Sequence, residues 1–112
     1  MATSHCPARG DLVWIDFFPK KGHEQSGRRP GIVLSPRAYN KTVGLILCCP
    51  ITSKEKGYPY EVALPSNLPI SGVVLSDQVR SLDWKNRNVS IISEAPPELI
   101  EDVLAKLQTL LT

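Results

Sequence analysis

The sequence has no hydrophobic run that approaches the roughly 18 to 20 apolar residues of a membrane-spanning helix. Its first ten residues also lack the basic start and the continuous apolar stretch of a secretory signal. These two absences argue against a membrane or exported protein. We therefore expect a cytoplasmic protein.

Cysteine and histidine are scarce as well. The three cysteines, Cys6, Cys48 and Cys49, are odd in number and two are adjacent, which makes a disulfide framework improbable. There is no Cys-x-x-Cys pair and there are only two histidines, so we expect no structural zinc or other metal site. Phosphate-binding glycine loops and a Gly-x-Ser-x-Gly nucleophile are missing too, so the sequence gives no support for nucleotide hydrolysis, dinucleotide binding or serine hydrolase chemistry.

Length and charge indicate the number of domains and the kind of ligand. A chain of 112 residues predicts a single domain spanning 1–112. The net charge of +2 divides unevenly, because residues 93–112 contain four acids and one lysine, a balance of −3, and leave +5 on residues 1–92. A basic body with an acidic tail is compatible with a polyanionic ligand, although the excess is too small to prove nucleic-acid binding.

The cationic side chains concentrate in the loop from Lys20 to Pro30, between two apolar runs. Pro30 disfavours helix at Arg29, which is therefore expected at the start of a strand. Positive charge gathered at one rim of a sheet would suit phosphate. Taken alone, however, this composition is more typical of a solvated, charged surface hairpin loop, because loops usually lie on the surface and are polar.

Most of the chain predicts short strands rich in β-branched residues, followed by one amphipathic helix. The helix starts at Pro96–Pro97 and runs for about four turns, with its apolar stripe on the sheet and its acids in water. Arg37–Asn40 predicts a turn or a single helical turn, and Pro50 is expected to end the third strand. The predicted strands are Asp11–Phe18, Gly31–Leu34, Leu45–Cys49, which should be central, Tyr60–Leu64, Gly72–Leu75, which could continue through Asp77–Leu82, and Asn88–Ile92.

Polar side chains stand at the ends of these strands, where a sheet delivers them to its rim. Cleavage of an RNA phosphodiester needs help in removing the 2′-hydroxyl proton, in stabilising charge on the phosphate oxygens and in protonating the leaving oxygen. Guanidinium and hydroxyl donors suit the second task. The candidates are Glu24, Arg29, Thr52, Ser53, Asp77, Gln78 and Arg80.

These residues stand within blocks that together resemble a known family. The blocks are Gly10–Phe17, Gly22–Pro30, Val33–Pro36, Pro50–Ser53, Lys56–Val62 and Gly72–Trp84. In this order and spacing they resemble the MazF/PemK (Kid) toxins of type II toxin–antitoxin systems, over nearly the whole chain. The resemblance implies a mainly β fold, a small SH3-like β-barrel of the CcdB/PemK type with a C-terminal α-helix.

The resemblance also implies an activity and partners. The expected function is sequence-specific endoribonuclease cleavage of single-stranded RNA, without a metal or other cofactor, leaving a 2′,3′-cyclic phosphate and a 5′-hydroxyl and inhibiting translation and growth. The expected assembly is a homodimer, bound by a MazE-like antitoxin whose flexible, acidic C-terminal segment occupies the RNA groove. The implied catalytic residues are Arg29, Thr52 and Glu24, and the implied RNA-binding residues are Phe17, Lys20, Gln25, Gly27, Arg28, Ser53, Lys54, Lys56, Tyr58, Asp77, Gln78 and Arg80.

The role of the arginine needs a chemical correction. Family accounts make it the general base, yet a guanidinium has a pKa above about 12 and stays protonated in proteins. Our hypothesis is that Arg29 stabilises the pentacovalent phosphorane and helps the leaving oxygen, while Thr52 donates to a non-bridging oxygen. Glu24, the single anion of its loop, is then the general base.

Two other functions stay open on the sequence alone. CcdB-like toxins share this barrel but poison DNA gyrase by binding it, and fold alone does not separate the two activities. A catalytically silent RNA-binding homologue is the third possibility. The loop Glu24–Pro30 and the segment Pro50–Ser53 favour the nuclease. Glu24 could also be a salt-bridge partner of Arg28 or Arg29, and Thr52 a turn residue that closes the third strand.

Overall fold

The computed structural model describes residues 5–17 and 27–112. Residues 18–26, which contain the predicted site residues Lys20, Glu24 and Gln25, lie outside the described ranges. The described elements are β1 (Asp11–Asp16), β2 (Arg28–Val33), α1 (Arg37–Val43), β3 (Ile46–Thr52), β4 (Glu61–Ala63), β5 (Val73–Leu75), β6 (Arg80–Leu82), β7 (Ser90–Glu94) and α2 (Pro97–Gln108).

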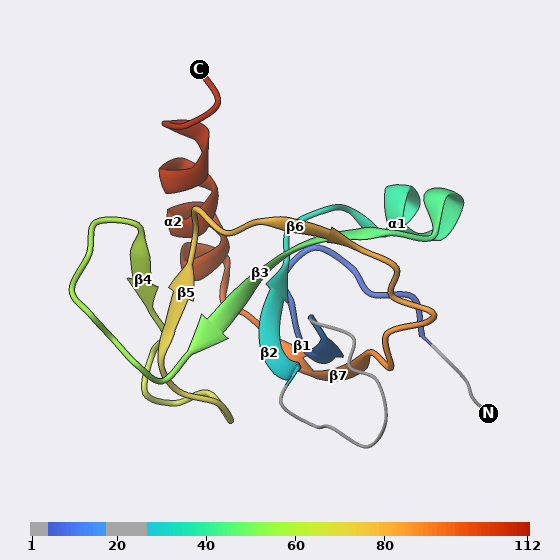
Figure 1. The fold of residues 1–112 in the computed structure, drawn as a ribbon, viewed down its shortest axis with the longest axis horizontal. Coiled ribbons are helices and arrows are strands. Elements are labelled where there is room, and N and C mark those ends of the chain that lie inside the picture. The colour runs from blue at the N-terminus through green and yellow to red at the C-terminus, as the bar shows by residue number, and fades with distance from the viewer. Residues whose placement is uncertain (1–4, 18–26) are drawn as a thin grey trace.

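The seven strands of the described chain form one bent antiparallel sheet in the order β4-β5-β3-β2-β1-β7 (Figure 1). β6 lies off this path and pairs with β3, whose Ile46–Cys48 segment faces β6 and whose Ile51–Thr52 segment faces β5. Within the described ranges, no pairing joins β7 to β4 or to β6. The predicted mainly β fold with a C-terminal helix is confirmed, but its barrel is not closed by hydrogen bonds.

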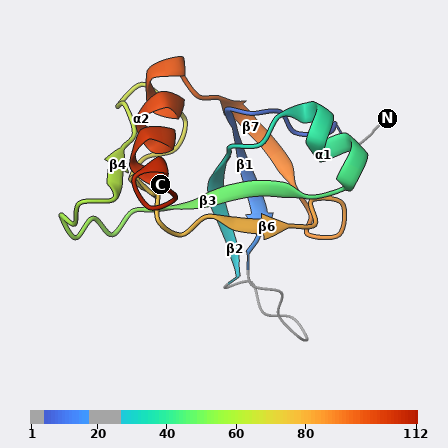
Figure 2. The ribbon, with the colours of Figure 1, turned by 90° about the horizontal axis from the view of Figure 1, so that it is seen from above.

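Alternating side chains of β1, β2 and β3 build two separate hydrophobic clusters. Leu12, Ile32 and Cys49 belong to the cluster that Leu99 and Val103 of α2 complete. Their sequence neighbours Val13, Val33 and Cys48 belong to the second cluster, with Leu82 and Trp84. Both faces of these strands are therefore buried. The central position of β3, between β5 and β2, agrees with the prediction from its apolar sequence. Figure 2 shows α2 and α1 at opposite ends of the sheet.

The predicted C-terminal helix is confirmed as α2. Its buried residues, Leu99 and Val103, are one turn apart, and its acids Glu98, Glu101 and Asp102 are exposed. No helix in the described part of the chain combines the length and the apolar character that crossing a membrane requires.

Two elements differ in extent from prediction by more than a shift of their ends. α1 extends to Val43 and is therefore longer than a single turn. The run predicted from Gly72 to Leu82 is divided into β5 and β6 by a turn in which the N–H of Gln78 donates to the carbonyl of Leu75 at 3.1 Å. The two strands pair with successive parts of the same edge of β3, and the register shifts by three residues between them, because Val74 is opposite Ile51 whereas Arg80 is opposite Cys48.

Pro50 does not end β3, contrary to prediction. The carbonyl of Leu47 accepts from the N–H of Leu34, so Leu47 directs its backbone groups toward β2. Strand alternation then turns Pro50 away from β2, toward the edge where β3 passes from β6 to β5. A missing N–H costs no ladder bond at such an interruption, so the strand can continue to Thr52.

Candidate functional site

A groove of about 620 Å³ opens beside the ends of β2 and β3. It brings together side chains from β1 to β5 and from the loops on either side of β4. Many of the predicted site residues line it, with several apolar ones. The lining residues are Trp14, Arg28, Arg29, Pro30, Ile51, Thr52, Ser53, Lys54, Lys56, Tyr58, Glu61, Pro69, Ile70, Ser71, Leu75 and Gln78.

Arg29 and Thr52 both line this groove, and the register of their strands accounts for it. Gly31 pairs with Pro50, and continuing that antiparallel register by two residues sets Arg29 opposite Thr52. Arg29 is exposed, and the Thr52 hydroxyl accepts the N–H of Lys54 at 3.1 Å. A hydroxyl that accepts one bond still has its proton to donate. A guanidinium and a hydroxyl donor therefore share one wall of the groove.

The backbone of Gly72 packs closely against the backbone of Thr52. Its φ is +125°, a conformation that side chains rarely adopt, and a Cβ built there would lie only 2.2 Å from the carbonyl oxygen of Thr52. The backbone at the start of β5 can therefore approach Thr52 this closely only with glycine. Thr52 is also paired with Val73, so β5 holds the threonine from its side of β3.

The loop between β3 and β4 presents two exposed lysines, Lys54 and Lys56. Its shape is held by Glu61, whose two carboxylate oxygens accept the N–H groups of Lys56 at 2.9 Å and Gly57 at 2.8 Å. The Lys106 ammonium of α2 donates to the carbonyl of Pro59 at 2.8 Å. These bonds hold the backbone of the loop in place, and they occupy the Glu61 carboxylate with two backbone N–H groups.

Tyr58 and Asp77 form a second polar pair beside the groove. The Tyr58 hydroxyl lies 2.6 and 2.7 Å from the two carboxylate oxygens of Asp77. Its hydrogen bond to Asp77 raises the pKa of Tyr58 above the ordinary value for tyrosine. The phenol therefore stays protonated at neutral pH and serves as a donor.

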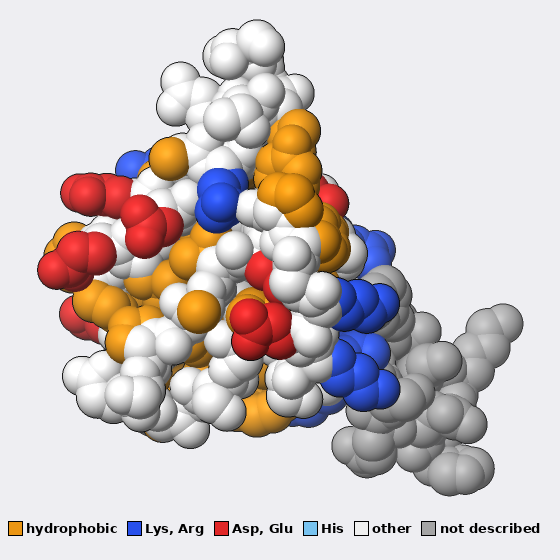
Figure 3. Space-filling view, turned by 90° about the vertical axis from the view of Figure 1, so that its left-hand side faces the viewer, with side chains coloured by type: hydrophobic (Ala, Val, Ile, Leu, Met, Phe, Trp, Pro, Cys, Tyr) orange, Lys and Arg blue, Asp and Glu red, His pale blue; other side chains and the backbone are white. Residues whose placement is uncertain are grey.

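Charge on this part of the surface is segregated. Figure 3 shows most of the visible Lys and Arg side chains gathered at one edge of the face, and most of the acidic ones toward the other edge. Among the described residues, the groove lining contains four cations, Arg28, Arg29, Lys54 and Lys56, and one carboxylate, that of Glu61. Arg28 is paired with Asp16 at 3.4 Å. Phosphate would be attracted to such a surface.

Not every predicted RNA-binding residue lies in the groove. Phe17 is fully buried in the cluster with Ile15 and Trp84, so its side chain is a core residue and the predicted surface contact needs correction. Gly27 is buried, and its carbonyl accepts the N–H of Phe17 at 2.9 Å. Arg80 lies in β6 opposite Cys48 and is not among the lining residues. Asp77 contributes through Tyr58.

The two adjacent cysteines are buried, as expected from their place in a central strand. Cys48 and Cys49 have no exposed surface. Burial raises the pKa of both thiols, that of Cys49 to about 12. Neither is a thiolate nucleophile at neutral pH. Among the described residues, no group of three or more His, Cys, Asp or Glu side chains is arranged to hold a metal ion.

Sequence reasoning missed three residues that shape the groove. Trp14 is 39% exposed although it lies in a strand of buried neighbours. Alternation along β1 was the available signal, because it places Trp14 on the opposite face from Val13 and Ile15. Glu61 and Gly72 gave no local signal, since their roles depend on contacts that only the folded chain brings together.

The chain matches the family model described as "PemK-like, MazF-like toxin of type II toxin-antitoxin system" over residues 8–111. The chain belongs to this family. It is 44% identical over 111 residues to the "Endoribonuclease toxin MazF" of Escherichia coli strain K12, covering 99% of both chains.

Solved structures agree with this membership in the PemK-like, MazF-like family. A MazF crystal structure from Deinococcus radiodurans is 53% identical, with a TM-score of 0.88, and the match covers 96% of this chain and 98% of that one. A MazE–MazF crystal structure from the same organism is 48% identical, with a TM-score of 0.85, covering 96% and 97%. The predicted family and its fold are confirmed.

Proposed function

We propose that this toxin-family chain is an endoribonuclease that binds single-stranded RNA in the groove and cuts it without a metal. The observation that carries the proposal is the meeting of Arg29 and Thr52 in one groove with the exposed lysines Lys54 and Lys56. The similar E. coli protein, which bears the name of an endoribonuclease toxin, supports the same activity. Exposed Trp14 adds an aromatic surface on which a base could stack.

The proposed reaction is an internal transesterification. The 2′-oxygen attacks phosphorus, the bond from phosphorus to the 5′-oxygen breaks, and the products are a 2′,3′-cyclic phosphate and a 5′-hydroxyl. Arg29 stabilises the negative phosphorane, and the Thr52 hydroxyl donates to a non-bridging oxygen. The departing 5′-oxygen takes its proton from solvent water, and the Arg29 guanidinium stabilises the charge on that oxygen as the bond breaks.

Glu24 is proposed as the base that takes the 2′-hydroxyl proton. This assignment rests on sequence, since Glu24 lies outside the described residues, and on the general rule that a guanidinium does not act as a base in proteins. Glu24→Gln should lower the cleavage rate and remove the acidic limb of its pH profile. Near-normal cleavage by Glu24→Gln across a pH series would contradict the assignment.

The proposed partner is a MazE-like antitoxin with a flexible acidic segment. Support comes from the four cations of the groove and from the solved MazE–MazF complexes of a similar toxin. We further propose that the chain works as a homodimer in the cytoplasm, where messenger RNA is accessible. Light scattering on the purified toxin, alone and with the antitoxin, measures both assemblies.

The direct test is incubation of the purified protein with a long single-stranded RNA in EDTA, followed by mapping of the new ends. The proposal expects cuts at one short recurring sequence, cyclic-phosphate and 5′-hydroxyl ends, and loss of cutting in Arg29→Ala and Thr52→Ala. Intact RNA with the wild-type protein would overturn the proposal. A DNA supercoiling assay would then separate a gyrase poison from a silent RNA binder.

A further inference from the structure

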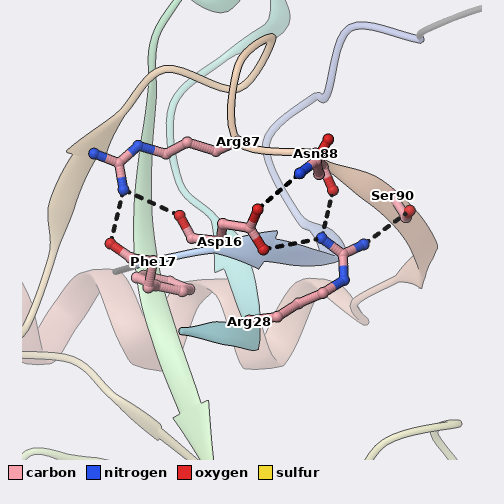
Figure 4. A network of polar contacts seen from close by, with 6 residues as sticks. All are labelled: Asp16, Phe17, Arg28, Arg87, Asn88 and Ser90. Carbon is pink, nitrogen blue, oxygen red and sulfur yellow. Dashed lines mark hydrogen bonds and ion pairs between the residues drawn. The ribbon is translucent and has the colours of Figure 1, made fainter. Parts of the chain in front are cut away.

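Five polar residues surround the point beside the groove where β1 ends and β2 begins (Figure 4). We call this group the strand-end clamp. It joins the last pair of the β1–β2 ladder to the turn that precedes β7. Its members are Asp16, Arg28, Arg87, Asn88 and Ser90.

Arg28 directs its guanidinium at groups of the protein itself. Nη1 donates to the carbonyl of Asn88 at 2.7 Å and lies 3.4 Å from Asp16 Oδ1, while Nη2 donates to Ser90 Oγ at 3.2 Å. Asp16 and Arg28 are also directly opposite each other in the ladder. These bonds use three of the five guanidinium N–H donors, including both on Nη1, so an RNA phosphate could bind Nη1 only by displacing the Asn88 carbonyl or Asp16, although the side chain borders the groove.

Asn88 is shaped to complete this arrangement. Its φ is 55°, the one positive value among non-glycine residues of the described chain. Asparagine tolerates this left-handed conformation better than most residues. The side-chain amide of Asn88 donates to Asp16 Oδ2 at 2.8 Å, while the backbone carbonyl of Asn88 accepts from Arg28. One residue therefore contacts both members of the ion pair.

Arg87 holds the backbone at the end of β1. Its Nη1 donates to the carbonyls of Asp16 at 3.0 Å and Phe17 at 2.7 Å, and its own carbonyl accepts the N–H of Asp16 at 2.9 Å. The ladder between β1 and β7 stops at Trp14 and Ser90. Beyond this point, the hydrogen bonds of Arg87 take the place of the β1–β7 ladder and connect the end of β1 to the turn that precedes β7.

We propose that Arg28 is a positioning residue which acts through Asp16 and Asn88 to fix Arg29, and that it does not itself bind RNA. Arg29 is the next residue of β2 and pairs with Ile15 of the clamped strand. A displacement of about 1 Å at a reacting group can cost about 10²-fold in rate. The inference rests on the proposed nuclease function and replaces the predicted RNA contact of Arg28.

The test separates binding from cleavage in Arg28→Gln. Binding is measured with an RNA whose 2′-hydroxyl at the cut is methylated, over a range of salt, and cleavage as the single-turnover rate at saturating enzyme. We expect the rate to fall about tenfold to a hundredfold, with the dissociation constant and its salt dependence unchanged. The matched control, Lys54→Gln, should weaken binding and flatten the salt dependence by about 0.7 per lost phosphate contact.

Two further variants distinguish positioning from charge. Arg28→Lys keeps the positive charge but not the planar fork, so positioning predicts that it cleaves as slowly as Arg28→Gln. Asp16→Asn keeps the shape of the acid and removes its charge, and the double variant with Arg28→Gln should cleave no more slowly than the slower single variant.

The outcomes are distinguishable. An active wild type whose Arg28→Gln variant keeps its rate but binds more weakly, or whose Arg28→Lys variant recovers binding and cleavage, would overturn the inference alone. A wild type that leaves all RNA intact would overturn the nuclease proposal and this inference with it. Circular dichroism confirms that each variant is folded.

Discussion

The two ends of β3 carry polar residues in opposite settings. Near Ile46, Asn40 of α1 is fully buried, and its amide donates to the carbonyls of Pro7 at 2.8 Å and Ser35 at 3.0 Å. The backbone carbonyl of Asn40 accepts from the N–H of Gly44 and from the indole N–H of Trp84. At the other end, Thr52 is half-buried and Arg29 exposed beside a cationic groove.

The contrast separates a structural polar cluster from a functional one. Around Asn40, burial is compensated by hydrogen bonds within the protein, so that end is stable and has no need of a ligand. The groove instead carries like charges close together, and an anionic ligand would relieve their repulsion. Substitutions at the Asn40 end should therefore change stability, and substitutions at the groove end should change catalysis.

Asn40→Ala should have the largest effect on stability. It leaves the buried carbonyls of Pro7 and Ser35 without their donor, at about 1 to 3 kcal/mol for each unsatisfied group. We expect the free energy of unfolding in urea to fall by about 2 to 4 kcal/mol. The cleavage rate per folded molecule should not change, and a rate loss beyond the unfolded fraction would break the contrast.

Thr52→Val should have a large effect at the groove end. The substitution keeps the shape of the side chain and removes the hydroxyl donor, so the cleavage rate should fall about 10²-fold. Unfolding in urea should be close to that of the wild type, because the hydroxyl is only partly buried. Stability lost without loss of rate would make Thr52 a turn residue of β3.

Trp14→Ala tests the aromatic wall of the groove. If a base stacks on the indole, RNA should bind about tenfold more weakly, in line with about 1 to 3 kcal/mol for a stacked base. Ile91→Ala is the control, because Ile91 is equally exposed at 39% but is not a lining residue. Equal effects of the two changes in a binding titration would exclude a specific stacking role.

Asp77→Asn should give the smallest effect, confined to the ionisation of Tyr58. The hydrogen bond to Asp77 raises the pKa of Tyr58, so replacing the carboxylate should bring that pKa down toward the ordinary value. Ultraviolet titration of the tyrosinates, with Tyr58→Phe to identify the signal, measures the change. An unchanged titration would show that Asp77 does not control the phenol.

Local sequence patterns predicted the secondary elements well, because burial on both faces leaves a clear apolar signal in β1 and β3 and period 3.6 marks α2. The division between β5 and β6 was not readable, since it depends on which part of β3 each strand meets. The prediction that Pro50 ends β3 was wrong for a similar reason. Whether its missing N–H costs a hydrogen bond depends on which strand lies beside it, and local sequence does not show that.

Family resemblance placed Arg29 and Thr52, and strand register then brought them together. It could not show that Phe17 is in the core, because an aromatic residue at a strand end suits either a core or a stacking surface. Nor did a run of two arginines show that Arg28 and Arg29 differ. That difference comes from Asp16, Asn88 and Ser90, two of which follow Arg28 by about 60 residues.

The most direct test of the account compares Arg29→Ala with Asn40→Ala in single-turnover RNA cleavage in EDTA, with each rate divided by the folded fraction from urea unfolding. The account predicts a loss of at least about 100-fold for Arg29→Ala at unchanged stability, and a normal rate per folded molecule for Asn40→Ala. A near-normal rate for Arg29→Ala, or a loss that only follows unfolding in both variants, would contradict it.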